Sequence, residues 1–129
     1  MPVRTFHATV VTLPEAPYPH RRLPARLCFD AAHPYAVQLS FPPDGAGWSF
    51  ERDLLERGRH EPVGAGDVVI EPAPGRQVLI RLRTPGDQLV LAVPADTVAA
   101  FLCDAYTLVP PGTESDHLDL DAALARLLD

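Results

Sequence analysis

Apolar and polar residues alternate in short segments along the first three quarters of the chain. One segment would place Val37 and Leu39 on the same face of a strand, and another would do so for Val78, Ile80 and Leu82. A period of two residues is typical of a half-buried β-strand. The pattern predicts six to seven strands, within residues 6–11, 26–29, 35–41, 48–50, 68–71, 78–83 and 88–93.

The segment nearest the N-terminus has apolar side chains in both of its alternating sets. One set consists of Phe6, Ala8 and Val10, and the other of His7, Thr9 and Val11. The alternation predicts a strand here.

Two turn signals indicate how the strands connect. In Thr84-Pro85-Gly86-Asp87 the proline presets φ and the glycine accepts a positive φ at the next position. This turn should fold residues 78–83 back onto residues 88–93 as an antiparallel hairpin. Residues 42–47 should join the strands on either side of them in the same way.

Helical spacing is confined mainly to the C-terminal third. The first predicted helix carries Val98, Phe101, Leu102 and Ala105, with Asp96 or Thr97 as its N-cap. A second would present four leucines on one face: Leu120, Leu124, Leu127 and Leu128. A short helical turn is also expected at residues 52–55, closed by Gly58.

These elements predict one α+β domain over residues 1–129. We expect an antiparallel sheet of six to seven strands with two C-terminal helices. Residues 14–24 are rich in proline and should form an exposed loop.

Charge and hydropathy restrict the function classes. The net charge is −6, and all eleven basic side chains are arginines. An acidic chain is a poor nonspecific binder of DNA or anionic lipid, since such binding depends on neutralising phosphate charge. We found no apolar run of the ~18 residues needed to span a membrane and no signal peptide. We therefore expect a cytoplasmic protein.

Candidate catalytic and metal-binding residues do not form a recognised pattern. Cys28 and His33 are five residues apart, which is no known nucleophile–base arrangement, and both Cys28 and Cys103 are expected to be buried thiols. The five histidines are scattered without metal-ligand spacing. The sequence thus predicts no catalytic residue, no metal site and no cofactor.

Two surfaces are candidates for contacts with other chains. The hairpin over residues 78–93 is apolar on both faces, which would suit a subunit interface. The predicted interface residues are Val78, Leu79, Ile80, Leu82, Leu89 and Leu91. The predicted partner surface consists of Arg52, Asp53, Arg81 and Arg83. Arg81 and Arg83 also leave open a single-stranded nucleic-acid-binding module, despite the acidic total charge.

The order and spacing of several segments resemble the SsgA-like proteins of sporulating actinobacteria. The resemblance covers residues 24–129. It is carried by His33-Pro34-Tyr35-Ala36-Val37, Trp48-x-Phe50-x-Arg52-Asp53-Leu54-Leu55, Gly64-x-Gly66-Asp67-Val68 and Val109-Pro110-Pro111-Gly112-Thr113-Glu114. His33 departs from the family, which usually has Asp at this position.

The resemblance implies a whirly-like α+β fold assembled as a homotrimer. It also implies a non-enzymatic adaptor that helps septum-site selection in sporulation-specific cell division. The chain's ending is most similar to the branch of the family that recruits the tubulin-like division GTPase FtsZ. The implied partner is therefore FtsZ or an SsgA-type paralogue, and the implied location is the cytoplasmic side of division septa.

Overall fold

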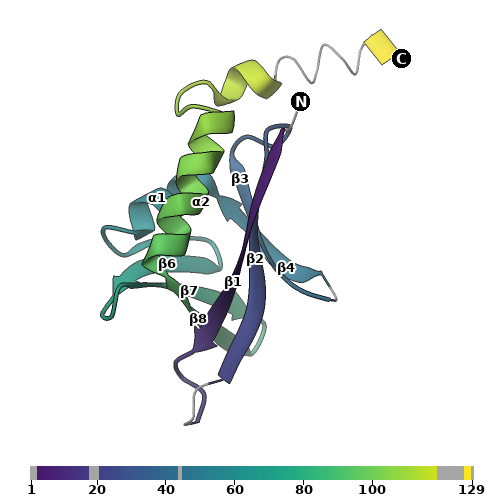
Figure 1. Ribbon diagram of the computed structural model, residues 1–129. Helices are drawn as coiled ribbons and strands as arrows, with labels where there is room; N and C mark the ends of the chain where they lie inside the picture. The colour runs from purple at the N-terminus through teal and green to yellow at the C-terminus, as the bar shows by residue number, and fades with distance from the viewer. Residues whose placement is uncertain (1–2, 18–20, 44, 119–126, 129) are drawn as a thin grey trace.

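The structure, a computed structural model, describes residues 3–17, 21–43, 45–118 and 127–128. These residues form one curled, antiparallel, eight-stranded sheet with the order β4-β3-β2-β1-β8-β7-β6-β5 (Figure 1). The strands are β1 (Arg4–Leu13), β2 (Arg21–Asp30), β3 (Ala36–Phe41), β4 (Ala46–Glu51), β5 (Val63–Ala65), β6 (Val68–Ala73), β7 (Gln77–Thr84) and β8 (Asp87–Pro94). Helix α1 (Arg52–Gly58) follows β4, and α2 (Ala95–Leu108) follows β8.

The predicted α+β class with antiparallel strands is confirmed, but the strand count is eight instead of six to seven. The strand that was not predicted is β5. It has three residues, Val-Gly-Ala, and such a segment is too short to show an alternating pattern. It pairs with β6 through a turn at Gly66, whose φ of +58° suits glycine.

Both predicted hairpins are present. Thr84 pairs with Asp87, so Pro85 and Gly86 form the two-residue turn between β7 and β8, and Gly86 has φ +82°. Strands β3 and β4 pair over six residues on either side of the second turn.

The expected loop at residues 14–24 is shorter than predicted, because β2 already begins at Arg21. Pro24 lies inside this strand and pairs with Val10 of β1. The neighbouring strand β3 pairs with β2 only at residues 26–28, so one edge of β2 is open at Pro24. A proline fits such a position because its missing N–H leaves no ladder bond unmade.

The hydrophobic core lies between the inner face of the curled sheet and the two helices. Helix α2 runs beside β1 and contacts β1, β2, β7 and β8, while α1 packs near β5 and β6 (Figure 1). Phe50 and Leu54 are buried, and Trp48 packs against the core. Gly58 permits the close approach of α1 to β6, since a Cβ built there would lie 2.2 Å from Ile70 Cγ2.

The two predicted C-terminal helices have different outcomes. Helix α2 buries the four expected residues: Val98, Phe101, Leu102 and Ala105. Its N-cap is Pro94, so the helix begins earlier than the predicted caps and lacks a side-chain cap. Of the second helix, Leu120 and Leu124 lie outside the described residues, while residues 114–118 are helical and Leu127 and Leu128 are exposed.

Candidate functional site

The predicted oligomer interface on the β7–β8 hairpin is largely part of the protein's own core. Val78, Ile80, Leu82 and Leu91 are each at most 2% exposed, because they face inward against the helices. Leu79 and Leu89 are partly buried. The prediction is therefore wrong for the four inward residues, which are unavailable to a second chain in the folded protein.

Arg52 was predicted to lie on a partner surface and is instead buried, with 3% of its surface exposed. Its Nη1 donates hydrogen bonds to the carbonyl oxygens of Ala105 (3.2 Å) and Val109 (2.8 Å). Its guanidinium carbon lies 4.9 Å from the ring centroid of Phe29 and 4.6 Å from that of Tyr106. Arg52 therefore joins α1 to the end of α2.

The surroundings of Arg52 perturb two pKa values. Burial lowers the pKa of Arg52, and this effect is partly opposed by Tyr106 and by Glu114, whose carboxylate lies 3.5 Å from Nη2. Burial, and secondarily the negative charge of Glu56, raises the pKa of Tyr106 to about 12. The Tyr106 hydroxyl donates a hydrogen bond to Glu56 Oε2 at 3.4 Å. These groups form a polar cluster that fixes the helix ends.

The other three predicted partner residues are accessible to different degrees. Asp53 is exposed and forms an ion pair with Arg57 one helical turn later, at 2.9 Å. Arg81 is half-buried on the outer face of β7 and forms a cross-strand ion pair with Glu71 at 3.0 Å. Arg83 is exposed near the end of β7. The structure does not bring Asp53 together with Arg83, because α1 and the outer face of β7 belong to different sides of the sheet.

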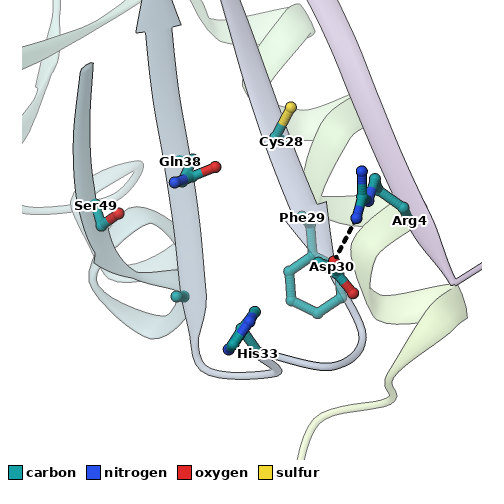
Figure 2. Close-up of a pocket in the computed structure, with 8 residues that line it drawn as sticks. Arg4, Cys28, Phe29, Asp30, His33, Gln38 and Ser49 are labelled. Carbon is teal, nitrogen blue, oxygen red and sulfur yellow. Dashed lines mark hydrogen bonds and ion pairs between the residues drawn. The ribbon is translucent and has the colours of Figure 1, made fainter. Parts of the chain in front are cut away.

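A concavity of about 500 Å³ opens over strands β2, β3 and β4. It is lined by Arg4, Cys28, Phe29, Asp30, His33, Ala36, Gln38 and Ser49. Figure 2 shows the ion pair between Arg4 and Asp30 at its rim, where Arg4 Nη2 lies 3.1 Å from Asp30 Oδ2. The rest of the lining mixes apolar side chains, such as Phe29 and Ala36, with polar ones, such as Gln38 and Ser49.

The concavity does not contain a recognisable catalytic arrangement. Cys28 and His33 lie at separate ends of it, and within the described part of the chain no hydrogen bond joins them (Figure 2). The described residues also contain no group of three or more potential metal ligands. Cys28 is partly buried, but Cys103 is exposed, which corrects the prediction of two buried thiols.

Sequence reasoning missed an apolar stripe on the outer face of β1. Phe6 is 58% exposed and Val10 is 50% exposed, and Ala8 lies between them. The guanidinium carbon of Arg26 on β2 lies 5.0 Å from the ring centroid of Phe6. Because both alternating sets of β1 contain apolar residues, the sequence alone gave no sign of which set faces outward.

Comparison with known proteins defines the class to which this fold and surface belong. The family model for the Streptomyces sporulation and cell division protein SsgA matches residues 23–114. This match covers more than half of the chain, and the chain therefore belongs to the SsgA family.

Individual relatives are similar in sequence to this protein along most of its length. The sporulation-specific cell division protein SsgB of Streptomyces coelicolor is 38% identical over 95% of this chain and 92% of its own length. SsgB of Kineococcus radiotolerans is 42% identical over 82% of this chain and 68% of its own length. The similarity to SsgB that the C-terminal residues indicated is confirmed.

Solved structures show the same fold. An SsgA-like sporulation-specific cell division protein from Thermobifida fusca superposes with a TM-score of 0.88 and 32% identity, covering 95% of this chain and 94% of that one. A structure reported with SsgB mutations that correlate to longitudinal cell division in sporulating Streptomyces coelicolor has a TM-score of 0.80 and 34% identity. It covers 91% of this chain and 98% of that chain.

Proposed function

We propose that this protein is a non-enzymatic adaptor in sporulation-specific cell division, which helps septum-site selection and recruits FtsZ. The observation that carries the proposal is its similarity, over nearly its full length, to proteins named for sporulation-specific cell division. An adaptor acts through surfaces, and the described residues present an exposed apolar stripe on β1. The proposed location is the cytoplasmic side of division septa.

The whirly-like fold and homotrimer implied by the family resemblance belong to the same proposal. A trimer must use surfaces other than the inward face of the β7–β8 hairpin, because that face is filled by the chain's own core. No helix within the described residues is long and apolar enough to cross a membrane. Light scattering during size-exclusion chromatography should give three times the 14.0 kDa mass of one chain.

Binding to FtsZ and septation in cells test the proposed function together. The purified chain should co-sediment with FtsZ polymers, and deletion of its gene should reduce sporulation septa. An SsgA-type paralogue in place of FtsZ in the co-sedimentation assay tests the other proposed partner. Loss of septa without binding to either protein would contradict the recruitment step while leaving the cell-division role intact.

Single-stranded nucleic-acid binding remains the alternative function, and it has less support. Arg81 already pairs with Glu71, and among the described residues Arg83 on the same outer face of β7 forms no ion pair. The double variant Arg81→Glu/Arg83→Glu should abolish salt-sensitive oligonucleotide binding if this surface holds a single strand. Binding that is unchanged in the double variant would exclude this surface.

A further inference from the structure

The orientation of β1 leaves one of its two alternating sets of apolar side chains in water. His7 of the other set points inward, where its ring packs edge-on against Phe101 at 5.7 Å and its Nε2 lies 2.7 Å from Asp104 Oδ2. Successive side chains of a strand point to opposite faces. Phe6, Ala8 and Val10 therefore face outward together, and contiguous exposed apolar residues usually mark an interaction site.

Strand β2 places arginines beside this apolar stripe. Ala8 pairs with Arg26, Val10 with Pro24 and Thr12 with Arg22, so both arginines point to the same outer face. Within the described residues neither Arg22 nor Arg26 forms an ion pair. They are four positions apart along the strand, which corresponds to about 13 Å. The face is therefore locally basic, although the chain as a whole carries a charge of −6.

The concavity described above continues this face. Phe6 pairs with Cys28, Cys28 with Gln38, and Gln38 with Ser49, so one row of outward side chains runs from the stripe into the concavity. The concavity of about 500 Å³ can accept a large side chain next to Phe6. An anchor residue in a pocket, surrounded by weaker contacts, is a common arrangement in protein interfaces.

We infer that this outer face of β1 and β2 docks an acidic segment with apolar side chains from a partner protein. Carboxylates would pair with Arg22 and Arg26, and apolar side chains would cover Phe6 and Val10. The proposal rests on the adaptor function proposed above, to which it adds the surface and the chemistry of the partner.

The same observations favour a protein segment over a nucleic acid. Single-strand binders stack successive bases on several aromatic rings. Among the described residues of β1 and β2, Phe6 is the one aromatic ring on this face, and Arg26 already lies over it. Its other members, Ala8, Val10 and Pro24, offer apolar contact without stacking.

Photo-crosslinking tests the surface directly in the full chain. A benzoylphenylalanine in place of Phe6 is expected to crosslink, in sporulating cells, to a segment of another protein whose sequenced peptide is acidic and apolar. The change Arg22→Glu/Arg26→Glu should lower the yield about tenfold, which corresponds to the loss of roughly 1.4 kcal/mol of binding free energy. The matched control carries the crosslinker at Ala100, which is exposed on α2.

Three results would overturn the docking surface: crosslinks only to a second copy of this chain, crosslinks to nucleic acid, or no yield above the Ala100 control. Size-exclusion elution and circular dichroism of each variant separate loss of folding from loss of binding.

Binding of purified FtsZ then distinguishes the proposed recruitment of FtsZ from the proposed docking surface. If FtsZ binds the Arg22→Glu/Arg26→Glu variant as well as the natural chain, and position 6 captures no acidic segment of any protein, recruitment stands and this surface is refuted. If position 6 captures an acidic segment of a different protein, the surface stands and FtsZ is not its occupant.

Discussion

Replacing Arg52 measures how strongly one buried guanidinium holds the end of α2 to the rest of the protein. Its side chain begins at α1 and reaches the carbonyl oxygens of Ala105 and Val109, at 3.2 and 2.8 Å. The Ala105 carbonyl also accepts the Val109 N–H at 3.0 Å, whereas the Val109 carbonyl lies past the last residue of α2. The change Arg52→Met keeps an apolar stem between Phe29 and Tyr106 and removes both hydrogen bonds.

The expected loss follows from these contacts. A hydrogen bond from a charged donor contributes about 1.5–3 kcal/mol, so two of them give about 3–6 kcal/mol. Removing the charge of Arg52 relieves the cost of burying it, and the lowered pKa of Arg52 reports this cost. The change also leaves the carboxylate of Glu114 without its partner. Removing one partner of a buried ion pair costs about 3–5 kcal/mol, because the other charge is left uncompensated. We therefore expect Arg52→Met to lower the free energy of unfolding by about 3 kcal/mol.

Urea unfolding followed by the fluorescence of Trp48, the chain's single tryptophan, measures this change. The matched control is Arg57→Met on the same helix, whose ion pair with Asp53 is exposed. Exposed pairs of this kind contribute about 0–1 kcal/mol. Arg52→Lys should also destabilise the protein, since an ammonium lacks the planar fork that donates to two carbonyls and stacks on rings.

Equal losses for Arg52→Met and Arg57→Met would refute the structural role given to Arg52. A gain in stability for Arg52→Met would mean that the cost of burying its charge exceeds the value of its contacts.

Three further measurements test other parts of the structure. Tyr106 should ionise at a pKa of about 12 in an ultraviolet titration. Because this pKa is raised by folding, its stabilisation is present below pH ~10 and is lost as the pH rises towards about 12. Gly58→Ala should cost about 1–3 kcal/mol by overpacking Ile70, and this loss should be smaller in an Ile70→Ala background, which lacks the Cγ2 nearest to the added methyl, whereas an equal loss in both backgrounds would contradict the contact. Exposed Cys103 should react with a maleimide before the partly buried Cys28, as mass spectrometry of peptides would show.

Local signals in the sequence were sufficient for most of the sheet. The β7–β8 hairpin follows from alternation on both sides of Pro85-Gly86, and both depend only on neighbouring residues. The start of α2 was placed wrongly because Pro94 ends β8 and caps the helix at once, so no connecting loop separates the two elements. Strand β5 depends on pairing with β6, which its own three residues cannot indicate.

The candidate surfaces could not be predicted in the same way, because burial depends on contacts between distant parts of the chain. The β7–β8 hairpin is apolar on both faces, and only the curl of the sheet and the position of α2 decide which residues are covered. Arg52 carries a charge that usually indicates exposure. It is buried because Phe29 and Tyr106, from β2 and α2, lie on its two sides.

Both alternating sets of β1 carry apolar side chains, and the fold covers only one of them. The inward set places Val11 and Leu13 against the core, so turning the strand over would expose these residues in exchange for Phe6 and Val10. A fully buried side chain of the Phe or Val type contributes about 1.5–3 kcal/mol, so the outward set would also gain from being covered. A partner that covers Phe6 and Val10 would supply this burial, and the outward stripe of β1 is therefore the surface on which the adaptor function should be tested.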